Sequence, residues 1–138
     1  MEVKSFTLNN LGRFSNLELP LAPLGNLDSN VTVFMGNNGS GKTSILRGLA
    51  TSLSWFVARV RSESGSGSPI PELVIKNGVN SAAIDIDVFE HRYGPVEDDD
   101  AEAYDENYFS WRIAKTRKGR KGTFKSELSG ASALAENY

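Results

Sequence analysis

Apolar and polar residues alternate in several short segments of the chain. In residues 84–88, Ile84, Ile86 and Val88 are separated by two aspartates. A period of two is typical of a strand with one buried and one wet face, and it favours an antiparallel sheet. Strands are predicted from this alternation, or from an apolar and β-branched composition, at residues 2–9, 17–21, 73–75, 84–88 and 108–116.

A different pattern runs from residue 31 to residue 61. Residues 31–35, Val-Thr-Val-Phe-Met, lack polar alternation and predict a short, buried strand. From Lys42 to about Arg61 the apolar residues recur every three or four positions, which predicts an amphipathic helix. A second helix is expected over residues 127–137. The predicted apolar face of the first helix comprises Ile45, Leu46, Leu49, Leu53, Phe56, Val57 and Val60.

Two segments show neither the period of a strand nor the period of a helix. Residues 62–71 are rich in Ser, Gly and Pro, which predicts a flexible surface loop. Residues 91–107 are acidic and predict a mobile insertion. The expected organisation is one domain over residues 1–138. It divides into opening strands, a Gly-rich turn and a helix (1–61), the loop (62–71), and a β-subdomain with the start of a helical region (72–138).

Composition excludes several function classes. The 138 residues include no Cys and a single His, so a disulfide framework, a thiolate metal site and a Cys nucleophile are excluded. No apolar run approaches the length of a transmembrane helix and the N-terminus has no signal-peptide pattern, so we expect a cytoplasmic protein without a membrane segment. The net charge of −2 is unevenly distributed. Residues 90–110 carry one basic and eight acidic groups, whereas residues 111–138 carry seven basic and two acidic groups.

The Gly-rich turn contains a complete phosphate-binding motif. It lies between the predicted buried strand and the predicted helix, which is the context that a P-loop requires. The residues that match G-x-x-x-x-G-K-[ST] are Gly36, Asn37, Asn38, Gly39, Ser40, Gly41, Lys42 and Thr43.

The residue types in this motif suggest their roles with ATP and Mg²⁺. The glycines allow successive backbone N–H groups to converge on an anion, and the helix N-terminus adds its own N–H groups. Lys42 is the predicted catalytic residue, because its ammonium group reaches the β- and γ-phosphates. The hydroxyl of Thr43 is the predicted Mg²⁺ ligand. Ser44, one position further, is expected to contact an α-phosphate oxygen.

The residue sequence of the motif resembles the Walker A sequence of ABC-type ATPases of the SMC and RecF kind. The Asn-Gly pair at Asn38 and Gly39 is characteristic of those proteins. Residues 8–19 look like the opening β-hairpin of those proteins. Leu11 and Gly12 stand where Phe and Arg are usual, so a nucleotide contact made by that Arg would have to come from Arg13.

Later segments resemble a bacterial subgroup. Residues 84–86 and 111–118 are similar to AAA-type ATPases of anti-phage systems, in particular the PtuA ATPases of Septu and retron systems. The resemblance implies an α/β fold, namely a P-loop NTPase that is the N-terminal lobe of an ABC-type ATPase head with an antiparallel β-subdomain. It also implies a homodimer formed through the heads, an HNH-type nuclease partner, and a role in anti-phage defence or DNA maintenance.

Several parts of a complete ABC ATPase are missing from the sequence. The chain has no Gln for a Q-loop and no apolar strand that ends in Asp-Glu. Since Walker B carboxylates help to hold Mg²⁺ and position water, ATP hydrolysis is expected only in the intact protein. Two alternatives stay open. One is a stand-alone small P-loop NTPase or kinase that places Asp85 or Asp87 on Mg²⁺, and the other is a non-catalytic half-head that caps an ATPase partner.

A run of cations lies near the end of the chain. It predicts either a contact with the phosphate backbone of DNA or RNA, or a solvated hairpin tip without a partner. The scarcity of aromatic residues in the run favours the second interpretation. Its members are Arg112, Lys115, Arg117, Lys118, Arg120, Lys121 and Lys125.

Overall fold

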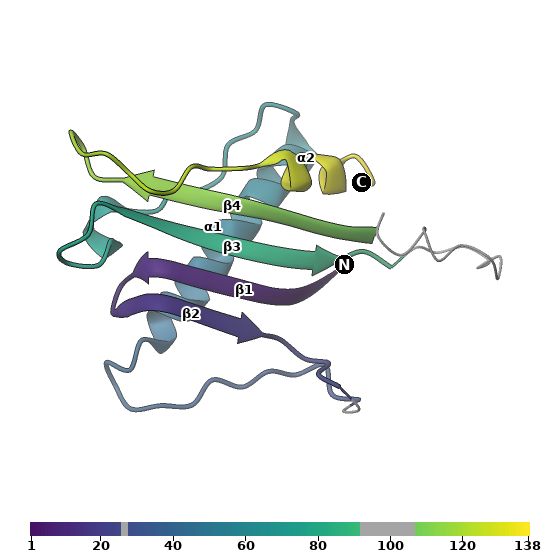
Figure 1. Ribbon diagram of the computed structural model, residues 1–138. Coiled ribbons are helices and arrows are strands. Elements are labelled where there is room, and N and C mark those ends of the chain that lie inside the picture. Colours follow the sequence, from purple (N-terminus) through teal and green to yellow (C-terminus); the bar gives the residue numbers. More distant parts are fainter. Residues whose placement is uncertain (26–27, 92–106) are drawn as a thin grey trace.

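The computed structural model describes residues 1–25, 28–91 and 107–138, and it contains a four-stranded antiparallel sheet with helices on one face (Figure 1). The strand order is β2-β1-β3-β4, so the first strand of the chain lies inside the sheet. Most of the predicted acidic insertion, 91–107, lies outside the described residues. The elements are β1 (Glu2–Leu11), β2 (Phe14–Pro20), α1 (Lys42–Arg61), the 3-10 helix η1 (Glu72–Val74), β3 (Ser81–Phe89), β4 (Tyr108–Thr116) and α2 (Ser129–Ala135).

The strand register gives the sheet two faces of opposite character. Because successive side chains point to opposite faces, the alternation predicted from the sequence becomes an apolar face and a polar face. Asp85 and Arg112 are paired on the polar face. The antiparallel β-subdomain is therefore confirmed, within a mixed α/β fold. One row across the apolar face reads, from β2 to β4, Leu19, Phe6, Ile86 and Trp111.

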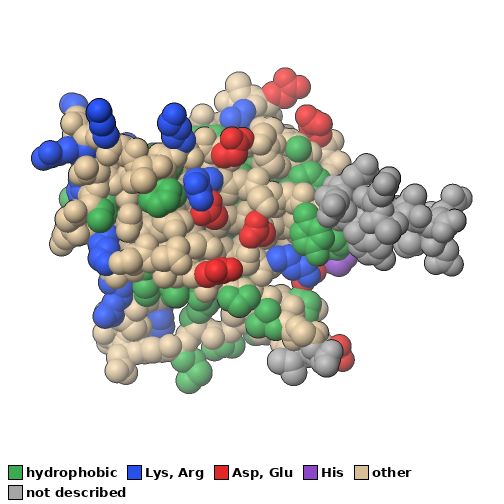
Figure 2. All heavy atoms as spheres, viewed as in Figure 1, with side chains coloured by type: hydrophobic (Ala, Val, Ile, Leu, Met, Phe, Trp, Pro, Cys, Tyr) green, Lys and Arg blue, Asp and Glu red, His purple; other side chains and the backbone are tan. Residues whose placement is uncertain are grey.

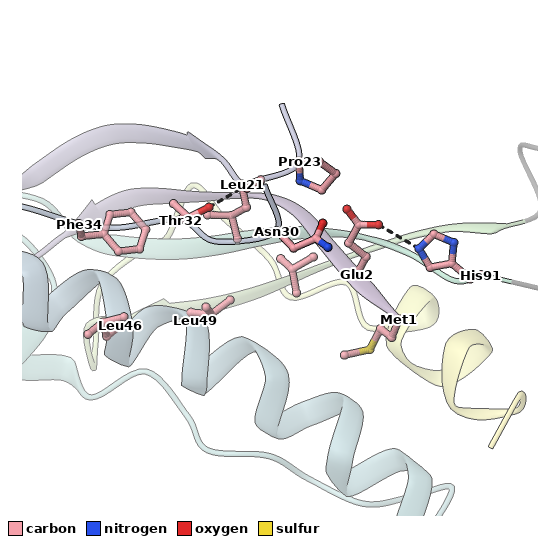
Figure 3. A pocket seen from close by; sticks show the side chains of 12 residues that line it. Met1, Glu2, Leu21, Pro23, Asn30, Thr32, Phe34, Leu46, Leu49 and His91 are labelled. Atoms are coloured by element: carbon pink, nitrogen blue, oxygen red, sulfur yellow. Dashed lines mark hydrogen bonds and ion pairs between the residues drawn. The ribbon is translucent and has the colours of Figure 1, made fainter. Parts of the chain in front are cut away.

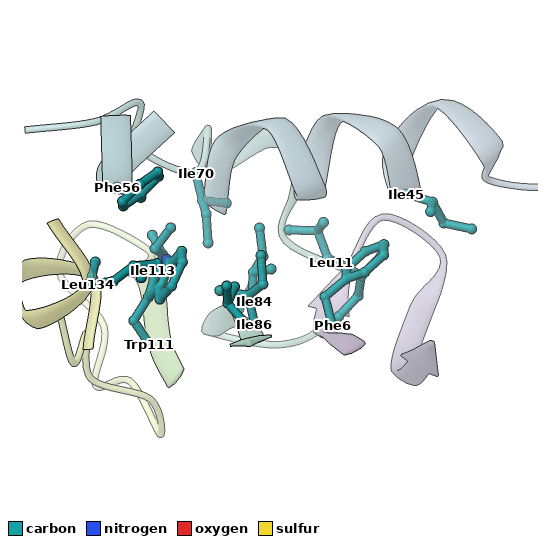
Figure 4. Close-up of a cluster of buried hydrophobic side chains, with 14 of the residues drawn as sticks. Phe6, Leu11, Ile45, Phe56, Ile70, Ile84, Ile86, Trp111, Ile113 and Leu134 are labelled. Carbon is teal, nitrogen blue, oxygen red and sulfur yellow. The ribbon is translucent and has the colours of Figure 1, made fainter. Parts of the chain in front are cut away.

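Helix α1 packs on the apolar face, and the core lies between the two (Figure 4). The helix approaches β1 closely at Gly48, where an added Cβ would lie 2.8 Å from Leu8 Cδ2. One turn later, the carbonyl oxygen of Ser52 accepts a hydrogen bond of 3.1 Å from Trp111 Nε1. The short helix α2 covers the β4 side of the same core with the fully buried Leu134.

The buried face of α1 differs from the predicted one. Leu46, Val57 and Val60 are 56%, 45% and 42% exposed, although the apolar periodicity placed them in the core. Gly48 and Ser52 are buried instead. The apolar stripe of α1 is wider than the part of the helix that faces the sheet, so the periodicity identified the helix correctly but overstated its buried stripe.

The predicted buried strand at residues 31–35 is wrong. This segment is outside every helix and strand, and Val31, Val33 and Met35 are 70%, 71% and 90% exposed. Only Phe34 is partly buried, where it packs against the core cluster. A strand needs a neighbour that supplies backbone hydrogen bonds, and no strand pairs with this segment among residues 1–25, 28–91 and 107–138.

The short strand predicted at residues 73–75 is also wrong. Residues 72–74 form the 3-10 helix η1, and Leu73 is 96% exposed. A single bridge between Leu11 and Ile75 is what remains of strand pairing there. The N–H groups of Val74 and Ile75 donate to the carbonyl oxygens of Pro71 and Glu72 within the turn, so they are not available to a neighbouring strand.

Residues 62–71 form a loop, as predicted, but the loop is packed closely against α1. The indole N–H of Trp55 donates to the carbonyl oxygen of Ser68 at 2.9 Å, and Ser68 N–H donates to Ser54 Oγ at 2.8 Å. Ile70 is 2% exposed and belongs to the core. The glycines in this loop permit close backbone contact, because a Cβ at Gly67 would lie 2.5 Å from the backbone nitrogen of Trp55.

Substitution of the loop glycines tests this packing. At Gly65 an added Cβ would collide with the backbone carbonyl of Ala58, and at Gly67 with the backbone of Trp55. We expect Gly65→Ala and Gly67→Ala each to lower the free energy of unfolding by about 1–3 kcal/mol in urea titrations, because the backbone must shift. The control is Ser66→Ala, an exposed position between them, which should change it by less than about 0.5 kcal/mol. Equal stability of all three variants would mean that residues 62–71 are not packed closely against α1.

Candidate functional site

The predicted P-loop, residues 36–43, runs into the N-terminus of α1. Gly39 and Gly41 have φ angles of 81° and 103°, a region that only glycine adopts readily. Gly36 is constrained by space, since an added Cβ would lie 2.5 Å from Ser40 Oγ. The first helical hydrogen bond runs from Ile45 N–H to the Gly41 carbonyl oxygen at 3.0 Å. The N–H groups of the first turn therefore lack helical acceptors and remain available for an anion.

The polar side chains of the loop suit a phosphate group. Ser40 Oγ is buried and has no hydrogen-bond partner among the described atoms, an unusual state for a buried hydroxyl. Lys42 Nζ donates to the carbonyl oxygen of Gly36, so its ammonium group is folded back over the loop. Thr43 is exposed, in the first turn of α1, while Ser44 lies beside the turn glycine Gly12. An open loop with an unpartnered donor and a poised ammonium group fits ATP with Mg²⁺.

Two residues from the β1–β2 turn contact the P-loop. Arg13 Nη1 donates to the carbonyl oxygen of Gly39 at 2.5 Å. The ring of Phe14 packs so closely against Gly41 that no Cβ would fit there. The sequence suggested Arg13 only as a replacement for a usual arginine, and it gave Phe14 no role. The available signal was their position directly after Gly12, whose φ of 59° forms the turn.

The two aspartates of β3 lie away from this site. Asp87 accepts hydrogen bonds of 2.6 Å from the hydroxyls of Ser5 and Ser110. Asp85 accepts two bonds from Arg112, at 2.6 and 3.0 Å, and one of 2.9 Å from Asn9. The side-chain hydrogen bond to Asp85 raises the pKa of Arg112. Both carboxylates occupy the polar face of the sheet, whereas the P-loop leads into the helix on the apolar face.

The cation run of residues 112–125 is not one surface. Arg112 is bound to Asp85, as above. The guanidinium of Arg117 donates to three backbone carbonyl oxygens, those of Val79, Ile75 and Lys76, at 2.9, 3.0 and 3.3 Å. These two arginines therefore have structural partners, and the exposed cations of the run are Lys118, Arg120, Lys121 and Lys125.

A separate hollow of about 770 Å³ lies between α1 and the loop that leads to the P-loop (Figure 3). Its apolar wall includes Leu21, Phe34 and Leu49. At its rim, Glu2 accepts bonds of 2.8 Å from Lys4 and 3.0 Å from His91. The bond from Lys4 is the main reason that the pKa of Glu2 is lowered. This hollow does not include the phosphate-binding motif.

Comparison with known proteins agrees with the motif and the fold. A family profile described as an AAA domain matches residues 5–137. The chain belongs to the AAA domain family. The probable ATPase of retron Ec83 from Escherichia coli is 27% identical to this AAA domain over 138 residues, which are 100% of the chain and 22% of that relative. The chain thus spans about a fifth of the length of the curated relative.

A solved structure supports the fold. It comes from work titled "Structural biochemistry of ATP-driven dimerization and DNA stimulated activation of SMC ATPases". The match has a TM-score of 0.55 and 16% identity, and it covers 95% of this chain and 80% of that chain. At this identity the likeness establishes a fold shared with an SMC ATPase head.

In the described residues of this AAA domain, no helix is long and apolar enough to span a bilayer, and no three metal-ligating side chains converge.

The division of the cation run can be tested on two adjacent residues. We expect Arg117→Ala to lower the free energy of unfolding by about 1–3 kcal/mol, because three carbonyl groups lose their donor. Lys118→Ala should change it by less than about 0.5 kcal/mol, since that side chain is exposed. Urea unfolding followed by circular dichroism measures both. An unchanged free energy of unfolding in Arg117→Ala would show that the hydrogen bonds from Arg117 to residues 75–79 do not contribute to stability.

Proposed function

We propose that this AAA domain binds ATP–Mg²⁺ through residues 36–44 as the N-terminal part of an ABC/SMC-like ATPase. The observation that carries the proposal is the P-loop, in which Gly39 and Gly41 shape the backbone and Ser40 Oγ is buried without a hydrogen-bond partner among the described residues. Membership of the AAA domain family and the SMC-like fold support it.

The proposed roles follow from position and chemistry. Lys42 leaves the Gly36 carbonyl and binds the β- and γ-phosphates, while the backbone N–H groups of the loop hold the remaining phosphate oxygens. Thr43 holds Mg²⁺, which neutralises charge on the phosphates when bound. Ser44 contacts the α-phosphate. Arg13 is the second cation of the site, because its guanidinium already reaches Gly39.

The wider function concerns the whole protein. We propose that the intact ATPase hydrolyses ATP and forms a homodimer through its heads. The supporting observations are the likeness to an SMC structure whose title names ATP-driven dimerization, and to a retron ATPase. Anti-phage defence with an HNH-type nuclease partner is the proposed setting, and DNA maintenance is the alternative. The stand-alone enzyme that uses Asp85 or Asp87 is disfavoured by their place on the polar face.

The ammonium group of Lys42 provides the first test. We expect Lys42→Ala to weaken binding of ATP–Mg²⁺ by about 10- to 100-fold in isothermal titration, the effect of losing a charge-assisted hydrogen bond. Its circular dichroism spectrum should not change, because Lys42 is not part of the core. The control is Arg47→Ala, an exposed cation on the same helix, which should bind as the wild type does. Unaltered binding by Lys42→Ala would refute the P-loop assignment.

Arg13 provides a second, independent test. We expect Arg13→Ala to weaken ATP binding on the order of tenfold, because one cation leaves the phosphate site. Lys4→Ala, which removes a cation from the opposite end of the same hairpin, is the matched control and should not affect affinity. Equal affinity of the Arg13 and Lys4 variants would assign the Arg13–Gly39 contact to structure alone.

A further inference from the structure

The P-loop contains an Asn–Gly pair in an exposed turn. Asn38 and Gly39 are the central residues of this turn, which Ser40 N–H closes by donating to the carbonyl oxygen of Asn37 at 3.0 Å. The Asn38 side chain is exposed, and neither its amide nor the Gly39 N–H makes a hydrogen bond within residues 1–25, 28–91 and 107–138. An added Cβ at Gly39 would meet no atom within 4 Å. The two groups are therefore accessible to each other and to water.

An exposed Asn–Gly pair undergoes an intramolecular reaction that other pairs resist, because glycine has no side chain to hinder its backbone nitrogen. The Gly39 nitrogen bonds to Asn38 Cγ, the Cγ–Nδ2 bond breaks, and ammonia leaves with the proton that the Gly39 nitrogen gives up. Water then opens the resulting succinimide ring at either of its carbonyl groups. The products are Asp and isoaspartate, in which the main chain continues through the side-chain carboxyl group.

The charges around the P-loop favour this reaction. The attacking species is the deprotonated backbone nitrogen, an anion that nearby cations stabilise. Lys42 and Arg13 donate to the carbonyl oxygens of Gly36 and Gly39, so both cations lie on the loop, and the N-terminus of α1 adds partial positive charge. Figure 2 shows Lys and Arg side chains gathered on the left, at the end where β1 finishes and α1 begins, while acidic side chains lie toward the middle and the right.

From these observations we propose that Asn38 is a site of spontaneous deamidation that inactivates nucleotide binding, and that a bound nucleotide protects it. The inactivation and the protection rest on the proposed function of residues 36–44. Isoaspartate adds one carbon atom to the main chain of the turn, which displaces the N–H groups that converge on a phosphate. The Asp product adds a negative charge beside the phosphate site. Phosphate oxygens that accept from the loop N–H groups hold the Gly39 nitrogen and its proton in place, so the ring does not close.

A second Asn–Gly pair provides an internal reference. Asn77 and Gly78 are exposed, and Val79 N–H closes their turn by donating to the carbonyl oxygen of Lys76 at 3.3 Å. The φ angle of Gly78 is 85°, close to the 81° of Gly39, and an added Cβ at Gly78 would also meet no atom within 4 Å. The two pairs therefore lie in similar turns, and a ligand of the P-loop should affect only one of them.

The experiment stores the Asn77→Gln variant in mildly alkaline buffer, with and without ATP–Mg²⁺, and follows conversion of Asn38 by peptide mass spectrometry. Gln cyclises far more slowly than Asn, so the P-loop pair is the one Asn–Gly pair left in the sequence. We expect the number of ATP-binding sites per chain, measured by isothermal titration after the nucleotide is removed, to fall in proportion to the conversion. ATP–Mg²⁺ at about ten times its Kd should slow the conversion about tenfold, since only nucleotide-free chains react.

The matched control is Asn38→Gln, in which Asn77 is intact. Its ATP binding after storage is compared with that of the same variant before storage, so that an effect of the substitution itself cancels. We expect the number of binding sites to be the same before and after storage. Conversion of Asn77 should proceed at the same rate with and without ATP–Mg²⁺.

Each result decides the proposal. An intact Asn38 under conditions that convert Asn77 would overturn it, and so would unchanged ATP binding after Asn38 has converted. Equal slowing of both pairs by ATP–Mg²⁺ would overturn the protection, since the nucleotide would then act on the whole fold. Absence of ATP binding before storage would refute the proposed function and the inactivation with it, whereas conversion of Asn38 is read from mass alone and still tests the deamidation.

Discussion

The close approach of α1 to β1 at Gly48 determines where the proposed phosphate-binding loop lies. A side chain at this position would hold the helix away from Leu8, because a Cβ would come within 2.8 Å of it. With the helix seated there, its N-terminus comes beside the β1–β2 turn, and Arg13 and Phe14 contact Gly39 and Gly41. The apolar alternation of β1 and β3 therefore supports the proposed nucleotide site as well as the stability of the fold, since it provides the surface on which the helix packs.

Local sequence predicted the elements in which the alternation of apolar and polar residues is strong. The alternation at residues 84–88 predicted an antiparallel strand, and the structure extends it to Ser81–Phe89. The prediction failed at residues 31–35 because hydrophobicity indicates a tendency to be buried but not what covers the segment. Val33 and Met35 are as apolar as a core strand requires, yet no described strand lies beside them. Pairing between strands depends on residues that a local pattern does not contain.

The candidate site was predictable in its motif and less so in its surroundings. Residues 36–43 follow a spacing that chemistry restricts, so the sequence alone points to them as the candidate site. Arg13 and Phe14 contact Gly39 and Gly41, which are more than 20 positions later in the chain, and no motif spacing predicts these contacts. The loop at residues 62–71 shows the same limit, because Ser and Gly suit a free chain and a close backbone contact equally. At Gly65 and Gly67 only the position of α1 decides between the two.

A continuous series of hydrogen bonds joins Arg117, which follows β4, to the P-loop. Arg117 binds the carbonyl groups of residues 75–79, residues 74–76 are bonded to the end of β1, and Arg13 reaches Gly39 from the turn. Such a series is a common scaffold, and it transmits a signal only if one of its links has two states. The links between residues 74–76 and the end of β1 are backbone hydrogen bonds that connect parts of the fold. The Arg13–Gly39 bond is different, since an anion in the loop would compete for the same guanidinium. A structural change that depends on ATP at this end of the sheet would therefore have to originate at Arg13.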